Sequence, residues 1–83
     1  MDKQQTYLVC GNRPYTKTTF ENTITHFPGQ WHFIGTREEI TPTVITKISP
    51  RFIFFLHWSW IVPNEICKKY ECVNFHMTDL PYG

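Results

Sequence analysis

The 83-residue chain is short enough for one small domain, and we predict a single domain over residues 1–83. Hydrophobic residues make up 41% and charged residues 18%, a balance that excludes intrinsic disorder. The formal net charge of +1 gives no strong field for phosphates, so we expect no DNA partner. The longest apolar run, residues 52–56, is far too short to span a bilayer, and we expect no membrane partner.

The cysteines and the N-terminus indicate the compartment. Cys10, Cys67 and Cys72 are an odd number without the spacing of a disulfide scaffold or of a zinc knuckle. The first five residues are polar and lack the shape of a signal peptide. These features predict reduced thiols in a cytoplasmic protein.

The first half of the chain predicts a strand, a helix and a second strand. Residues 6–10 are β-branched and aromatic without alternation, which is typical of a buried strand. Phe20, Ile24 and Phe27 share one face of a helix predicted over residues 15–27. Five threonines between residues 16 and 25 give that helix poor intrinsic propensity, so it must depend on tertiary packing. Residues 30–35 predict the second strand.

The second half repeats the alternation of helix and strand. Thr41 and Pro42 form a good helix start, and Pro50 ends that helix. The strongest strand signal in the sequence comes next, as a continuous apolar run within residues 51–58. The remaining predicted elements are a strand over 51–58, a loop over 59–63, a helix over 64–70 capped by Asn64, a strand over 71–77 and a loop over 78–83.

This order predicts a Rossmann-like α/β domain, a parallel sheet with helices on both faces. Each connection exceeds the dozen or so residues that a parallel crossover requires. We expect the first strand to lie between the second and the third, with the fourth beyond the third. Ligands then bind at the carboxyl ends of the first and third strands, near Asn12 and His57.

Known cofactor motifs are absent from the sequence. No G-x-G-x-x-G or Walker-type loop follows the first strand, which disfavours a dinucleotide site or a nucleotide-binding half-domain. The four histidines have no metal-binding spacing, so we expect no metal. His57 ends the strongest strand and is a candidate ligand contact.

The triplet Asn74-Phe75-His76 is a candidate catalytic site. In a strand, residues two apart point to the same side, so the Asn74 amide and the His76 imidazole project together. An amide can hold a developing oxyanion, and an imidazole can move a proton near neutral pH. The alternative is a structural strand end.

The segment from residue 74 onward resembles the catalytic segment of the folate-dependent formyltransferases. That family has N-x-H, three residues and then Leu-Pro, matched here by Asn74, His76, Leu80 and Pro81. Residues 54–63 resemble the family's central strand and pterin-binding loop. The resemblance covers residues 51–83, and the first fifty residues match only in β-α-β order. It looks most like the methionyl-tRNA and sugar N-formyltransferase branch, with the sugar-nucleotide type favoured.

The resemblance implies formyl transfer from 10-formyltetrahydrofolate to a small-molecule amine such as a nucleotide-linked sugar. It implies catalysis by Asn74 and His76. The implied folate contacts are His57, Trp58, Ser59, Trp60 and Ile61, and the substrate contacts are Asn12, Pro81 and Tyr82.

The family's catalytic aspartate lies some thirty residues beyond the histidine, outside this sequence, and we read Asp79 as a loop residue. The resemblance therefore implies the N-terminal part of a catalytic domain, with little or no turnover by itself. The fourth strand would lie at an unprotected edge of the sheet. Because such an edge can pair with a second copy of the chain, we also consider a homo-oligomer.

A non-catalytic α/β interaction domain is the alternative. Trp58 and Trp60 lying flat on solvent would favour it, whereas a groove formed around Trp60 would favour the enzyme.

Overall fold

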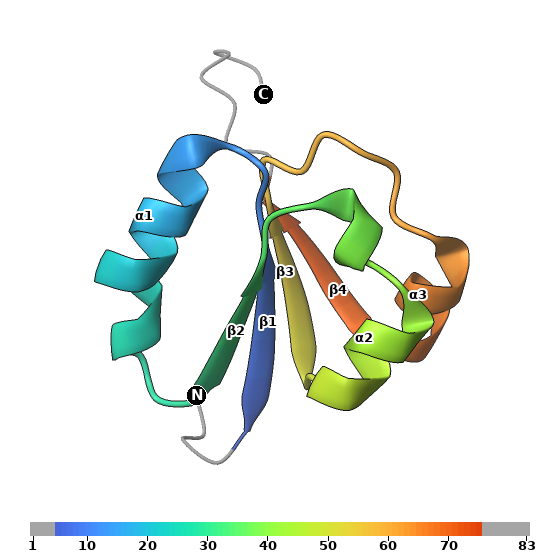
Figure 1. Ribbon diagram of the computed structural model, residues 1–83. Coiled ribbons are helices and arrows are strands. Elements are labelled where there is room, and N and C mark those ends of the chain that lie inside the picture. Colours follow the sequence, from blue (N-terminus) through green and yellow to red (C-terminus); the bar gives the residue numbers. More distant parts are fainter. Residues whose placement is uncertain (1–4, 76–83) are drawn as a thin grey trace.

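The computed structural model describes residues 5–75. Their four strands form one sheet (Figure 1). Each strand has five residues, and each neighbouring pair runs parallel in the order β2-β1-β3-β4. The strands are β1 (Thr6–Cys10), β2 (Gln30–Ile34), β3 (Phe52–Leu56) and β4 (Glu71–Phe75). This order confirms the predicted parallel sheet and puts the topological switch point between β1 and β3.

Helices cover both faces of the sheet, as predicted. Helix α1 (Pro14–Asn22) lies on one face, which we call the α1 face, and α2 (Pro42–Ile48) and α3 (Asn64–Lys69) lie on the other (Figure 1). Two single 3-10 turns, η1 (Ile24–His26) and η2 (Arg37–Glu39), complete the connections. Thr41 caps α2 by accepting a hydrogen bond from the Val44 backbone at 3.2 Å.

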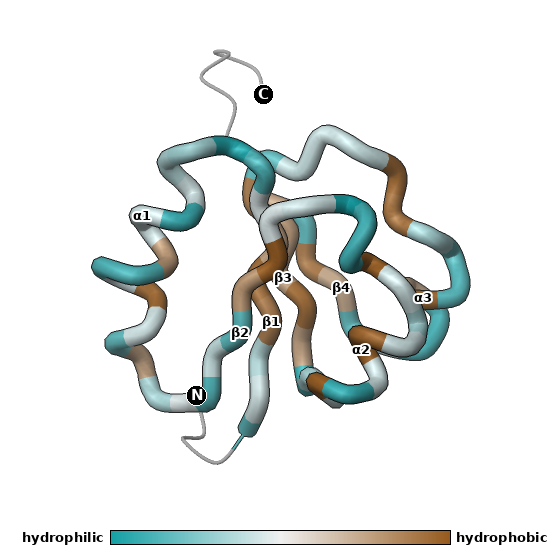
Figure 2. Tube along the Cα trace, viewed as in Figure 1, coloured by the Kyte–Doolittle hydropathy of each residue, from teal (hydrophilic) through white to brown (hydrophobic). Residues whose placement is uncertain are grey.

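The main apolar core lies between the sheet and helices α2 and α3. Alternate strand residues face it because successive side chains in a strand point to opposite sides. Figure 2 shows apolar residues running along the strands and on the inward sides of α2 and α3. The buried members of this core are Leu8, Cys10, Ile34, Ile40, Ile45, Ile53, Phe55 and Ile66.

The α1 face is rich in aromatic rings. Phe20 of α1 is buried with its ring 5.1 Å from the ring of Phe33, which anchors the helix over β2. Tyr7 is buried and its ring lies 4.8 Å from that of Trp31 and 6.4 Å from that of Phe54. Such tilted ring pairs stabilise the sheet beyond their buried area.

The predicted helix over residues 15–27 is wrong at its C-terminal end. Helix α1 ends at Asn22, and Thr23 leaves helical geometry with φ −128° and ψ −54°. The Thr25 hydroxyl donates to the Glu21 carbonyl at 3.0 Å, and Phe27 is 56% exposed. β-Branched threonines lose side-chain freedom in a helix, so Thr23 and Thr25 disfavour its continuation beyond Asn22.

Two further predictions are wrong: the end of the third strand and the residue that caps the helix after it. Strand β3 ends at Leu56 rather than at Trp58, because His57 adopts a left-handed backbone with φ 52°. Pro63 occupies the N-cap of α3, and Asn64 is already helical, so Asn64 does not cap the helix.

Within residues 5–75, no helix is long and apolar enough to cross a membrane. The same residues contain no group of three or more side chains that could hold a metal ion.

Candidate active site

The turn after β1 is tight and approaches α1 closely. The Gly11 backbone donates to the Ile34 carbonyl at 3.0 Å, and a Cβ at Gly11 would lie 2.6 Å from the Thr16 hydroxyl oxygen. Thr16 is only 2% exposed, and its hydroxyl donates to the Arg13 carbonyl at 2.6 Å. The absence of a side chain at Gly11 therefore lets α1 begin immediately beside the carboxyl end of β1.

Asn12 and Ser59 join the two loops that flank the switch point. The Asn12 side-chain amide donates to the Ser59 hydroxyl at 2.9 Å, and the Ser59 backbone donates to the Asn12 side-chain oxygen at 3.1 Å. Both residues were separate site candidates in the sequence, but their pairing over 47 positions was not predicted. The pair fixes the loop after β3 against the loop after β1.

His57 lies at the carboxyl end of β3 against Tyr15. The two rings meet edge to face with centroids 5.4 Å apart. Tyr15 is 52% exposed and lies in the first turn of α1, directly after Pro14. Sequence reasoning missed Tyr15, although an aromatic residue next to a helix-starting proline at the switch point was an available signal.

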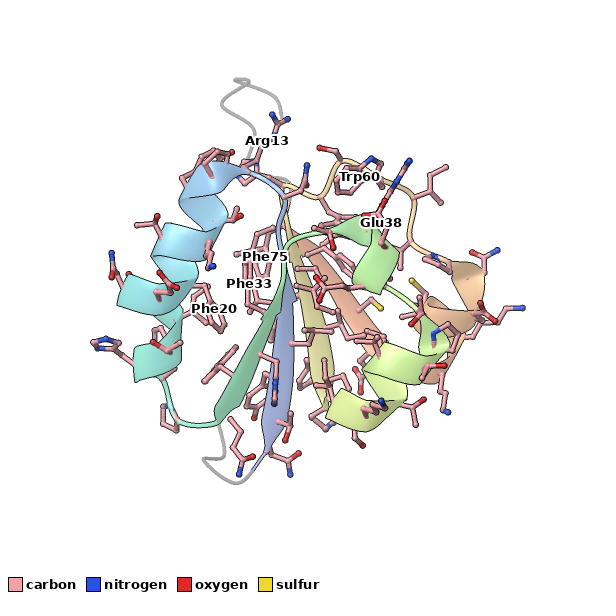
Figure 3. All side chains as sticks on the ribbon, in the orientation of Figure 1. Arg13, Phe20, Phe33, Glu38, Trp60 and Phe75 are labelled. Carbon is pink, nitrogen blue, oxygen red and sulfur yellow. The ribbon has the colours of Figure 1, made fainter. Side chains whose placement is uncertain are left out.

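The loop after β3 carries a stack of aromatic rings. The Trp58 ring lies 5.8 Å from Phe55 of the core, and the Trp60 ring packs edge to face on Trp58 at 5.1 Å. The Arg37 guanidinium lies 5.5 Å from the centre of the Trp60 ring, close enough for a cation–π contact. Figure 3 shows Trp60 at the same end of the sheet as Arg13. The sequence did not predict the contribution of Arg37.

The same loop carries backbone hydrogen-bond donors beside apolar side chains. Among the described residues, the backbone N–H groups of Trp60, Ile61 and Val62 have no hydrogen-bond partner. Ile61 is 95% exposed, and Val62 packs against the core. Backbone donors beside an aromatic and aliphatic wall can recognise a planar, hydrogen-bonding ring.

Asn74 is exposed near the end of β4 and pairs in register with Phe55 of β3. It points to the same face as Cys72, the face covered by α2 and α3. The Phe55 ring contacts Trp58, which begins the aromatic part of the loop after β3. The register therefore places Asn74 on the strand next to the start of that loop. His76, Asp79, Pro81 and Tyr82 lie outside the described residues, so their predicted roles stay predictions.

The three thiols are free in this structure. Burial raises the pKa of the Cys10 thiol well above its usual range. Burial, together with a side-chain hydrogen bond that the Cys72 thiol donates to Cys67, raises the pKa of Cys72 to about 12. Cys10 and Cys72 therefore stay protonated near neutral pH and act as packing groups rather than nucleophiles.

Comparison with solved structures finds a similar enzyme. Methionyl-tRNA formyltransferase from Clostridium thermocellum superposes with a TM-score of 0.74 and is 29% identical to this chain. The match covers 94% of this chain and 35% of that chain. No model of a known protein family matches the sequence, and no curated protein matches it.

The match covers the N-terminal part of the Clostridium enzyme and, because it spans 94% of this chain, includes most of the first fifty residues, where the sequence resemblance had extended only to the order of elements. The chain thus spans about a third of the length of the enzyme it matches. Its four-stranded parallel α/β fold resembles the N-terminal region of a formyltransferase.

Proposed function

We propose that this chain is the folate-binding and formyl-binding part of an enzyme that transfers a formyl group from 10-formyltetrahydrofolate to an amine. The supporting observation is the carboxyl edge of the sheet, where the Asn12–Ser59 pair, the Trp58–Trp60 loop and Asn74 come from neighbouring strands of a formyltransferase-like fold. Ligands of open parallel sheets bind at such an edge.

Asn74 and His76 would perform the transfer. As the amine attacks the formyl carbon, negative charge develops on the formyl oxygen, and the Asn74 amide would donate a hydrogen bond to it. The bond between the formyl carbon and the folate nitrogen then breaks, and His76 would pass the proton that the attacking amine loses to that leaving nitrogen. The exposure of Asn74 in β4 supports this role, because its amide is accessible from outside the sheet.

The folate would bind along the loop after β3. Its pterin ring would lie beside Trp58, Trp60 and Ile61 and accept hydrogen bonds from the free backbone N–H groups of the loop. His57 and Ser59 would shape the end of this pocket near the formyl group. The Asn12–Ser59 hydrogen bonds preorganise the loop and so lower the entropic cost of binding.

The amine would contact Asn12, Pro81 and Tyr82, the substrate residues that the resemblance implies. We favour an amino sugar on a nucleotide over methionyl-tRNA, the substrate named for the matched Clostridium enzyme. The chain by itself is expected to bind folate without turnover, because the further aspartate implied by the resemblance is not among its residues.

Tryptophan fluorescence tests the folate site. A non-reactive tetrahydrofolate analogue is titrated into the folded chain, and we expect quenching with a weak Kd, on the order of 0.1–1 mM. Trp60→Phe should remove much of this signal. Trp31→Phe is the matched control, because Trp31 lies on the α1 face, away from the loop. No response at millimolar analogue, in protein shown to be folded by circular dichroism, would contradict the pocket.

An interaction domain is supported less well by the two loop tryptophans. Trp58 and Trp60 are half-buried and packed on each other, on the core and beneath Arg37. Rings packed in this way do not lie flat on solvent as a docking surface would require.

A further inference from the structure

Two thiols lie next to each other where α3 packs against β4 (Figure 1). Cys67 belongs to the last turn of α3, and Cys72 is the second residue of β4. The Cys72 thiol donates a hydrogen bond to the Cys67 side chain, and its sulfur also lies 3.7 Å from the Tyr70 carbonyl oxygen. No disulfide joins the two cysteines in this structure.

The connection between α3 and β4 brings the two sulfur atoms together. Tyr70 leaves the helix in an extended conformation, with φ −121° and ψ 152°, and β4 begins at the next residue. Cys72 pairs in register with Ile53 of the main core, so its side chain points to the face that α3 covers. Ile66, which precedes Cys67 in α3, is buried in the same core. The core contacts and the short connection therefore hold Cys67 beside Cys72.

The two thiols differ in their access to solvent. Cys67 is exposed, so an oxidant in solution reaches its sulfur directly. Cys72 is half-buried against the core, and its raised pKa keeps it protonated near neutral pH, so it does not react first. Redox-sensitive cysteines are typically accessible thiols that lie next to a second thiol, which resolves the oxidised product.

We propose that Cys67 and Cys72 are a dithiol site that hydrogen peroxide converts into an intramolecular disulfide. The Cys67 sulfur attacks one peroxide oxygen and the O–O bond breaks, which leaves a sulfenic acid on Cys67 and releases one water. The S–S bond then forms to Cys72, whose proton leaves with the sulfenic hydroxyl as a second water. The two thiols lose two electrons, and one peroxide accepts them. A dithiol reductant reverses the oxidation by thiol–disulfide exchange.

The disulfide would join α3 to β4, the strand that carries Asn74. It closes the segment 67–72 and so removes conformational freedom from the unfolded chain. We therefore expect the Tm of the oxidised chain to rise by roughly 5–10 °C. A fall in Tm would mean that the bond distorts the fold, which would contradict a site whose geometry is already formed.

Alkylation and mass spectrometry test the proposal. The folded chain is treated with hydrogen peroxide, unfolded without reductant, alkylated with iodoacetamide and digested with trypsin. Trypsin cuts after Lys68 and Lys69, between the two cysteines, so a disulfide between Cys67 and Cys72 joins two separate peptides. We expect this joined pair of peptides, with the buried Cys10 alkylated instead. Dithiothreitol before alkylation should restore all three thiols.

Two variants separate the roles of the thiols. Cys67→Ala changes an exposed position, so the fold should be kept, and loss of thiols to peroxide should slow by at least about tenfold because no accessible thiol is left. Cys72→Ala should leave Cys67 as a sulfenic acid that dimedone labels, because the second thiol is absent. Circular dichroism confirms that each variant is folded.

Three results of the peroxide experiment would overturn the proposal. They are alkylation of all three thiols after peroxide treatment, a disulfide that includes Cys10 or joins two chains, and unchanged loss of thiols in Cys67→Ala. The experiment uses no folate and the dithiol site does not depend on the proposed function, so the failure of one leaves the other standing.

Discussion

The hydrogen bonds between Asn12 and Ser59 predict which of two alanine substitutions destabilises the protein more. Asn12→Ala removes both hydrogen bonds between the loops, whereas Ser59→Ala removes only the bond to the hydroxyl and keeps the bond from its backbone N–H. Each hydrogen bond contributes about 0.5–1.5 kcal/mol net, and these lie near the surface. We therefore expect Asn12→Ala to lower the free energy of unfolding by about 1–2 kcal/mol and Ser59→Ala by about half as much.

Thermal and urea unfolding, followed by circular dichroism, measure the ranking. A loss of 1 kcal/mol corresponds to a fall in Tm of about 4–8 °C in a domain of this size. Asn22→Ala is the control, an exposed asparagine at the end of α1, and should shift Tm much less. The loop should also bind folate more weakly in Asn12→Ala, because ordering it then costs entropy. Equal losses from Asn12→Ala and Ser59→Ala, or no loss from Asn12→Ala, would refute the argument.

Three more predictions follow from the same structure. Gly11→Ala should lower the urea midpoint by an amount equivalent to about 1–3 kcal/mol, because the new Cβ would lie 2.6 Å from the Thr16 hydroxyl; an unchanged midpoint would contradict the tight turn. In an active full-length enzyme, Asn74→Ala and His76→Ala should each lower kcat by ~10²–10³ with little change in KM for the folate, and steady-state assays showing normal kcat would disprove their roles. The contribution of Cys72 to the free energy of unfolding should be fully present below about pH 8 and be lost between pH 9 and 12, because the folded state raises the pKa of Cys72 from 9.0 to about 12 and only the unfolded chain releases that proton in this range. Urea titrations should show a shallower fall for Cys72→Ala, and an identical pH profile would argue against this cause.

The order of elements and the strand order were predictable because their signals are local. The apolar run over residues 52–56 identifies a central strand without knowledge of its neighbours, and crossover length and handedness then restrict the topology. The end of α1 was mispredicted because Phe27 fits the helical period, although it lines an apolar groove on the α1 face instead of continuing a helix. The helical spacing of Phe20, Ile24 and Phe27 carries no information about the backbone between them, where the helix ends at Asn22.

Much of the candidate site depends on contacts between distant parts of the chain, which the sequence does not encode locally. Asn12 and Ser59 were each identified, but their hydrogen bonds need the register of β1 on β3. The approach of Arg37 to Trp60 depends on how the η2 turn lies over the loop after β3. The contact of Cys67 with Cys72 was not predicted either, because it depends on how α3 packs against β4.

The position of β1 also has a consequence for biosynthesis. It is the first strand of the described residues, yet it lies inside the sheet, with Tyr7 paired to Trp31 on one side and to Phe52 on the other. At about 5–20 residues per second, a ribosome needs several seconds to deliver the second of these partners. During that interval an apolar strand has at least one bare edge. Slower translation of the segment between β1 and β3 should therefore increase capture by chaperones or aggregation of the nascent chain.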